Sequence, residues 1–241
     1  MNSLSNSSQA FIDAYREQDN DAPWLASLKQ SALESFSKSG FPTSRNEAWK
    51  YTSLKHLDHK KWTVAPIDTS VNEVNYMGVK NSHRLVFVNG RFNKELSVVN
   101  NIPDGAFIGP LGDALISQRS VLETYLCRIA EANLNPLLAL NTAYMEDGFV
   151  LVLRNVVLSE PVEIVHLGQA NGQDIAYHPR NLVILDDVSK ATIIEQFTGS
   201  DLGGYFANSA MEILVEGGSQ LNHHRVFEDG ANSTGVSSTV V

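Results

Sequence analysis

Cysteine is nearly absent from this chain, because Cys127 is the one cysteine among 241 residues. A single thiol excludes an intramolecular disulfide, and it excludes an iron–sulfur or zinc site built from several cysteines of this chain. Long apolar runs are absent too, and none approaches the roughly 20 residues that cross a bilayer. The start, Met1–Gln9, has neither the basic region nor the apolar core of a secretory signal. We therefore expect a cytoplasmic protein that does not bind a membrane.

Positive charge is also scarce. The chain has 18 basic and 27 acidic residues, which gives a net charge of −9, the wrong sign for a dedicated nucleic-acid binder. The short basic stretch Lys55–Lys61 contains Asp58, and we interpret it as a solvated helix face. With 43% hydrophobic residues, the composition is that of a globular protein with one large or two modest domains.

Several catalytic motifs are missing. The glycine cluster Gly199–Tyr205 lacks the lysine that a Walker A phosphate loop requires, so the chain is not itself a P-loop ATPase. There is no Gly-x-Ser-x-Gly elbow, and the local sequence suggests no histidine partner for Cys127. Asp186 and Asp187 are neighbours, whereas glycosidic chemistry needs two carboxylates opposed across a cleft. We interpret this pair as turn residues and predict no catalytic site.

The histidines give only weak metal signals. His223 and His224 are adjacent on a predicted strand and therefore point to opposite faces. His56 and His59 would share a helix face, but no third ligand lies nearby, so an exposed polar helix is favoured. His178 is held extended by the proline that follows it, which suits a positioned loop better than a catalytic base. We predict no metal site and no bound cofactor in this chain.

Apolar periodicity predicts helices in the first forty residues and again from Leu111 to Ile129, with Cys127 buried inside the second region. For the helix that ends near residue 40, Asp21 is a candidate N-cap, Pro23 suits the first turn and Gly40 suits the end. Asn135-Pro136 opens a short helix through Leu140. Between these regions, Asn89-Gly90 predicts a tight hairpin that joins residues 84–88 to 91–92.

From Phe149 onward the pattern changes to short strands separated by turn signals. Their centres fall near ten residues apart or near multiples of ten, which suits a sandwich, a barrel or a β-helix and does not choose among them. Several strands alternate clearly, as where Met211, Ile213 and Val215 alternate with Glu212 and Glu216. The predicted strands are Phe149–Leu153, Val162–Leu167, Leu182–Leu185, Thr192–Phe197, Ala210–Val215, Gln220–Val226 and Val236–Val241.

The stretch Phe41–Leu54 is dense in aromatic and charged residues directly after a helix end. Trp49 and Tyr51 each combine an apolar body with a polar tip, so they can pin a segment to a domain surface. Arg45 and Glu47 share a face only if the segment is extended. We predict that Arg45, Glu47, Trp49, Lys50 and Tyr51 anchor the N-terminal region. The plainer alternative is a well-docked linker.

The string Arg-x-Glu-x-Trp-Lys-Tyr-Thr-x-Leu in this stretch resembles the N-terminal hallmark of the SufB/SufD family, the scaffold proteins of iron–sulfur cluster assembly. Three later motifs resemble its SufD branch in the same order: Leu140–Ala143 followed by Asp147-Gly148, then Leu158–Val162, then His178–Asn181. The resemblance runs from about Phe41 to the end. The SufB branch carries several cysteines that serve cluster assembly, so a single cysteine also resembles SufD.

The resemblance implies a mainly β fold, a right-handed parallel β-helix preceded by a helical N-terminal region. We expect a helical region with the anchoring segment in 1–60, a mixed α/β region in 61–148 and β-helix coils in 149–241. Because the last predicted strand has no cap after it, we expect a β-helix truncated at its C-terminal end, with an open end that can self-associate.

The resemblance also implies a non-catalytic scaffold subunit that pairs with a SufB-like scaffold and a SufC-like ABC ATPase. In the full complex, iron or an iron–sulfur cluster would be the cargo. Two other classes of protein are alternatives to a scaffold subunit. A β-helix enzyme acting on polysaccharide would carry clustered carboxylates on one outward face, and a stand-alone binding module would be complete and stable by itself.

Overall fold

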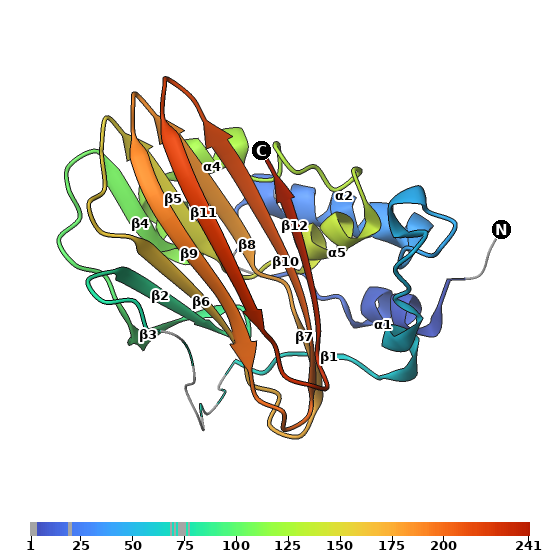
Figure 1. Ribbon diagram of the computed structural model, residues 1–241. Helices are drawn as coiled ribbons and strands as arrows, with labels where there is room; N and C mark the ends of the chain where they lie inside the picture. The colour runs from blue at the N-terminus through green and yellow to red at the C-terminus, as the bar shows by residue number, and fades with distance from the viewer. Residues whose placement is uncertain (1–3, 19–20, 68, 70, 72–75, 77) are drawn as a thin grey trace.

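Two largely parallel β-sheets face each other, and the chain crosses from one sheet to the other repeatedly along its length (Figure 1). The computed structural model describes residues 4–18, 21–67, 69, 71, 76 and 78–241. In it, Ala210 pairs with Arg180, and Gln220 pairs with Lys190, each thirty residues earlier. Strands of the same sheet thus recur once per coil, which is the arrangement of a parallel β-helix. The predicted fold class is confirmed.

The first sheet runs in the order β1-β7-β10-β8-β5-β4, with β12 also paired to β10. Its strands are β1 (Thr63–Val64), β4 (Ala106–Pro110), β5 (Phe149–Arg154), β7 (Asp174–Tyr177), β8 (Arg180–Asp186), β10 (Gly204–Val215) and β12 (Thr234–Val240). The second sheet runs in the order β11-β9-β6-β2-β3. Its strands are β2 (His83–Val88), β3 (Arg91–Val98), β6 (Val162–Gly168), β9 (Lys190–Gly199) and β11 (Gln220–Glu228).

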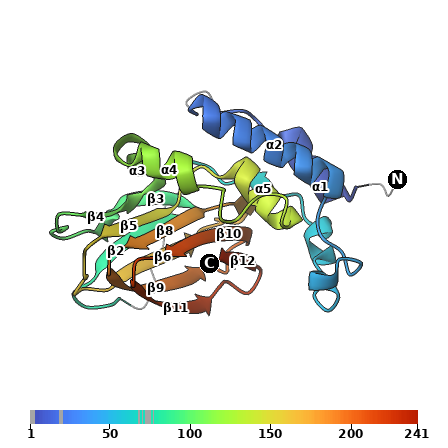
Figure 2. The same cartoon turned by 90° about the horizontal axis from the view of Figure 1, so that it is seen from above.

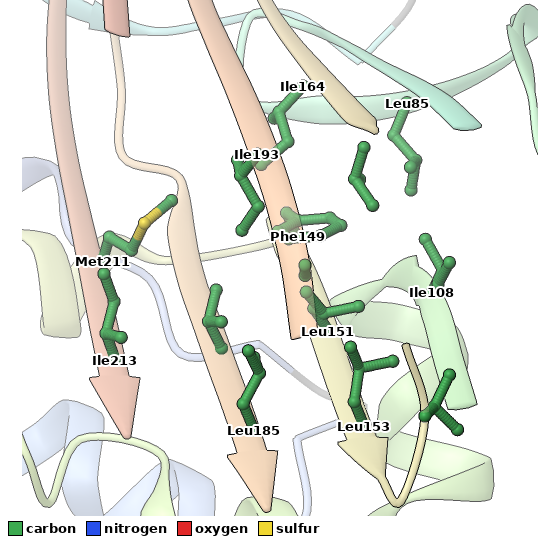
Figure 3. Close-up of a cluster of buried hydrophobic side chains, with 14 of the residues drawn as sticks. Leu85, Ile108, Phe149, Leu151, Leu153, Ile164, Leu185, Ile193, Met211 and Ile213 are labelled. Atoms are coloured by element: carbon green, nitrogen blue, oxygen red, sulfur yellow. The ribbon is translucent and has the colours of Figure 1, made fainter. Parts of the chain in front are cut away.

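The main core lies between the two sheets. Leu85, Ile164 and Ile193 of the second sheet meet Phe149 and Met211 of the first, and all five are fully buried (Figure 3). Alternate residues on each strand point inward, so the period-two pattern of the sequence fills this space with branched and aromatic side chains. Burial of this apolar surface, worth about 25 cal/mol per Å², is what holds the coils together.

Helices cover the outer face of the first sheet, as Figure 2 shows from above. They are α1 (Asn6–Ala14), α2 (Pro23–Ser39), α3 (Leu111–Ser117), α4 (Arg119–Tyr125) and α5 (Pro136–Tyr144). Two short 3-10 helices, η1 (Glu47–Trp49) and η2 (Lys55–His59), follow α2 and precede β1. Val150 and Leu182 point outward from the sheet and pack with Leu25 of α2 and Leu122 of α4. None of the helices in the described ranges is both long and apolar enough to cross a membrane.

Most predicted elements are confirmed, including the hairpin, where Asn89 and Gly90 take φ angles of 50° and 81°. Pro23 begins α2 and Gly40 ends it at φ 61°. The Asp21 N-cap is wrong: Ala22 is the cap, and Asp21 instead forms an ion pair of 2.8 Å with Lys29. A buried lysine needs a compensating charge, and Asp21 supplies it.

Three other expectations need correction. Cys127 is buried as predicted, but it lies in a turn after α4 at φ 61° and not inside a helix. Helix α5 continues past Leu140 to Tyr144, and the Asn135 side chain caps it by accepting from the Leu138 N–H. Strands β4 and β7 were not predicted. Strand β4 ends in Gly-Pro, which is unfavourable in a strand, and β7 has only four residues, which is too short to show an alternating pattern.

Candidate functional site

The segment expected to anchor the N-terminal region lies at the surface, beside α1 (Figure 2). Trp49 is half-buried and packs against a core cluster that contains Phe41, Leu54 and Phe206. Glu47 begins η1, so Arg45 and Glu47 do not share one extended strand. The Arg45, Glu47 and Lys50 side chains are exposed, and Tyr51 is 90% exposed. Trp49 alone of the five packs against the core, and the anchoring role of all five residues remains a prediction.

Residues just after this segment make several hydrogen bonds to the rest of the protein. Leu57 is fully buried, and its carbonyl accepts hydrogen bonds from Ser7 Oγ at 2.8 Å and from Trp62 Nε1 at 2.9 Å. Lys60 Nζ lies 2.9 Å from Asp174 Oδ1 of β7, and His56 Nε2 lies 2.9 Å from Thr234 Oγ1 of β12. These bonds join α1, η2 and the first sheet.

Two sequence motifs of the resemblance meet in a buried polar cluster beneath α5. Arg180 is fully buried, and its Nη2 lies 2.8 Å from Glu212 Oε1. Arg180 also donates to Thr142 Oγ1 at 3.1 Å and to the Ala130 carbonyl at 2.7 Å. Asn141 Nδ2 donates to the Pro179 carbonyl at 2.9 Å. Glu212 and Met211 point to opposite faces of β10, as the alternation predicts, but the face that carries Glu212 is covered by protein and not by solvent.

Glu212 also holds the turn that follows α4. Its carboxylate accepts backbone N–H bonds from Cys127 at 2.7 Å, and from Ile129 and Ala130 at 2.9 Å each. A buried carboxylate with one guanidinium and three amide donors is fully compensated. We call Arg180, Glu212, Asn141 and Thr142 the clamp, because they tie this turn and α5 to the first sheet.

Asp147 and Gly148, another pair from the resemblance, form the junction between α5 and β5. Asp147 accepts N–H bonds from Phe92 at 2.9 Å and Leu111 at 3.1 Å, which joins β3 to α3. Burial raises the pKa of Asp147, and these backbone hydrogen bonds lower it, with a net rise. A Cβ on Gly148 would lie 2.0 Å from the Arg180 carbonyl oxygen, so this close approach requires glycine.

A second polar cluster lies inside the β-helix. Glu195 follows the inward-facing Ile193 by two residues and is fully buried. Its two oxygens lie 3.2 Å from His166 Nε2, 3.1 Å from His223 Nε2 and 2.8 Å from Arg225 Nε. Burial alone would raise the pKa of Glu195, but the two histidines and the Arg225 charge lower it to about 2. We call these four residues the Glu195 cluster.

An aromatic stack runs beside the Glu195 cluster from coil to coil. The His166 ring lies 4.7 Å from the Phe197 ring, which lies 4.9 Å from the Phe227 ring, both pairs stacked. Arg225 covers Phe197 and Phe227 at 5.4 and 5.2 Å. The sequence analysis missed this arrangement. Its signal was the spacing of about thirty residues among these side chains, which is visible once the coil length is known.

His178 and the Asp186-Asp187 pair, which the sequence analysis considered, do not form a reactive site with any other described residue. His178 is buried among Phe11, Tyr144 and Phe206, and burial lowers its pKa to about 3, so it is a neutral core residue. Asp187 lies in a turn at φ 52°, as predicted, whereas Asp186 is the last residue of β8 and not a turn residue. Among the residues that the structure describes, no three His, Cys, Asp or Glu side chains are grouped to hold a metal ion.

Comparison with known proteins decides the family. The model of the SufBD protein N-terminal region matches residues 5–164. The SUF system FeS cluster assembly, SufBD core domain, matches residues 167–241. The chain belongs to the SufBD family. This confirms the resemblance, and with it the connection to iron–sulfur cluster assembly.

Individual SufBD relatives are distant. A SufBD family protein of iron–sulfur cluster assembly from Synechocystis is 27% identical over 90% of this chain and 50% of its own length. The SufD proteins of Escherichia coli and Bacillus subtilis are 24% and 23% identical, over 95% and 78% of this chain and 52% and 45% of their own lengths. The chain thus spans about half the length of the curated relatives it matches, and its relatives support a SufD-like member.

Cys127 does not suit the role of a cluster ligand in this SufBD chain. The residue is 3% exposed, and its backbone is fixed by Glu212. Burial raises the pKa of the thiol, with Arg180 acting in the opposite direction. A neutral buried thiol is a poor nucleophile and a poor metal ligand. Any iron or cluster would therefore have to be held by groups other than this cysteine.

Proposed function

We propose that this chain acts as a SufD-like, non-catalytic scaffold subunit in the SUF system of iron–sulfur cluster assembly. The observation that carries the proposal is the match of both SufBD family models along a chain that folds as a parallel β-helix. The compensated state of the clamp and the Glu195 cluster supports a structural role for their charges, because a carboxylate with all its acceptor positions filled is a poor acid, base or ligand.

The proposed partners are a SufB-like scaffold and a SufC-like ABC ATPase, and the proposed location is the cytoplasm. SufD relatives are named for iron–sulfur cluster assembly, which supports partners within that system. Iron or an iron–sulfur cluster would be cargo of the whole complex. Among the described residues, strand β11 pairs with β9 alone and β12 with β10 alone, so the free edges of these two strands offer backbone for self-association through strand pairing.

Deletion of the gene in its own organism tests the proposal. We expect the specific activity of an iron–sulfur enzyme such as aconitase to fall while its protein level stays constant. Treatment of the extract with ferrous iron and sulfide should restore that activity, because the defect lies in cluster supply. Unchanged aconitase activity in the deletion strain, with no second copy of the gene present, would overturn the proposal.

A further inference from the structure

The segment 43–61 is the most cationic part of an acidic chain. It holds five of the 18 basic residues and two of the 27 acidic ones. Lys60 forms an ion pair with Asp174. The other four, Arg45, Lys50, Lys55 and Lys61, are exposed and make no ion pair within the described part of the chain. The segment therefore presents unneutralised positive charge to solvent.

An exposed aromatic ring lies in the same segment. Tyr51 is 90% exposed, and Lys50 Nζ lies 5.3 Å from the centre of its ring. The apolar ring and the hydroxyl of Tyr51 are therefore both open to a partner. Tyrosine, tryptophan and arginine are the residues that most often dominate binding energy in protein interfaces, and this segment holds all three within seven residues.

The backbone beneath these side chains is fixed. Thr43 N–H donates to Asn46 Oδ1 at 2.9 Å, η1 and η2 are hydrogen-bonded turns, and Leu54 and Leu57 are buried on either side of Lys55. Half-buried Trp49 holds the centre of the segment. A surface ordered before binding loses less conformational entropy when a partner arrives, which favours affinity.

We propose that Arg45, Lys50, Tyr51 and Lys55 form a docking surface for an acidic segment of a partner protein. Carboxylates of the partner would pair with the cations, and an apolar or aromatic group would cover the Tyr51 ring. Charge complementarity selects an acidic partner. A nucleic acid fits less well, because the net charge of −9 repels a polyanion at a distance and Glu47 and Asp58 lie within the segment.

This proposal does not depend on the iron–sulfur function, since it rests on charge, exposure and the order of one segment. The test replaces Tyr51 with the photo-cross-linker p-benzoylphenylalanine in the full protein, expressed in its own organism. Irradiated cells are analysed by mass spectrometry to sequence the cross-linked segment. The matched control carries the same cross-linker at Ile116 of α3, which is 86% exposed and lies outside the docking surface.

We expect position 51 to cross-link to one protein segment rich in Asp and Glu, and position 116 not to reach it. The double substitution R45E/K50E should reduce the yield at position 51 by about tenfold, with an unchanged melting temperature, since both side chains are exposed. A yield no higher than at position 116, or a yield unaffected by charge reversal, would overturn the proposal. So would a cross-link to a basic segment, to nucleic acid or to a second copy of this chain.

Discussion

Replacement of Arg180 by methionine tests whether the clamp is structural. Arg180 is fully buried and donates to Glu212, Thr142, Asn141 and the Ala130 carbonyl. Methionine fills much of the volume but leaves the Glu212 charge without its guanidinium and three further acceptors without the Arg180 donor. Removal of one partner of a buried ion pair costs about 3–5 kcal/mol. For a chain of this size, that lowers the melting temperature by roughly 6–20 °C.

The assay is urea denaturation followed by circular dichroism, with thermal melting as a second measurement. Arg119→Met is the matched control, because Arg119 pairs with Glu123 at 2.7 Å on the exposed face of α4 and should contribute only about 0.3–0.5 kcal/mol. Arg180→Met combined with Glu212→Leu should lose less than the sum of the single losses, since the buried charge is removed as well. If Arg180→Met costs no more than the control, the clamp does not act as described.

Three further predictions concern single residues. Trp49→Ala should lower the free energy of unfolding by about 1–3 kcal/mol, less than for a fully buried tryptophan, and Tyr51→Ala by no more than about 0.5, both measured in urea. The pKa of His178 is about 3 in the folded protein, against an ordinary value of 6.5 for histidine. The unfolded state therefore binds more protons in acid, and the free energy of unfolding falls as the pH drops through 6.5, by about 2–3 kcal/mol at pH 4.5. His178→Phe should remove that part of the pH profile. Gly148→Ala should destabilise the protein by at least about 1–3 kcal/mol, because the added Cβ would meet backbone atoms of Arg180. Gly112→Ala in α3, which has open space around it, should be neutral or stabilise by up to about 1 kcal/mol. Equal melting temperatures for the two variants would contradict this account.

Local chemistry made much of the fold predictable. The Asn89-Gly90 turn, the Asn135 cap and the Gly40 helix end each depend on a few neighbouring residues, and all three are present. Short apolar runs bounded by turn signals likewise located β5 and β6, because both strands are buried in the fold.

The polar clusters were not predictable in the same way. Glu212 and Glu195 each find their partners one coil away, at Arg180 and Arg225, so the pairing depends on coil length and register. A glutamate opposite apolar residues on a strand predicts a solvated face, and only the helices above the first sheet reverse that for Glu212. Similarly, the aromatic residues of the 41–54 segment predict that both Trp49 and Tyr51 pin it to a surface, whereas the structure packs Trp49 against the core and leaves Tyr51 exposed.

The central claim is that this SufBD chain works as a scaffold subunit, and complex formation tests it most directly. The full coding sequence would be co-expressed with the SufB-like scaffold and the SufC-like ATPase of the same organism, with an affinity tag on this protein alone. Native mass spectrometry of the purified material should show a stable assembly that contains both partners. Recovery of the tagged protein without either partner, although both are soluble in the same cells, would contradict the account.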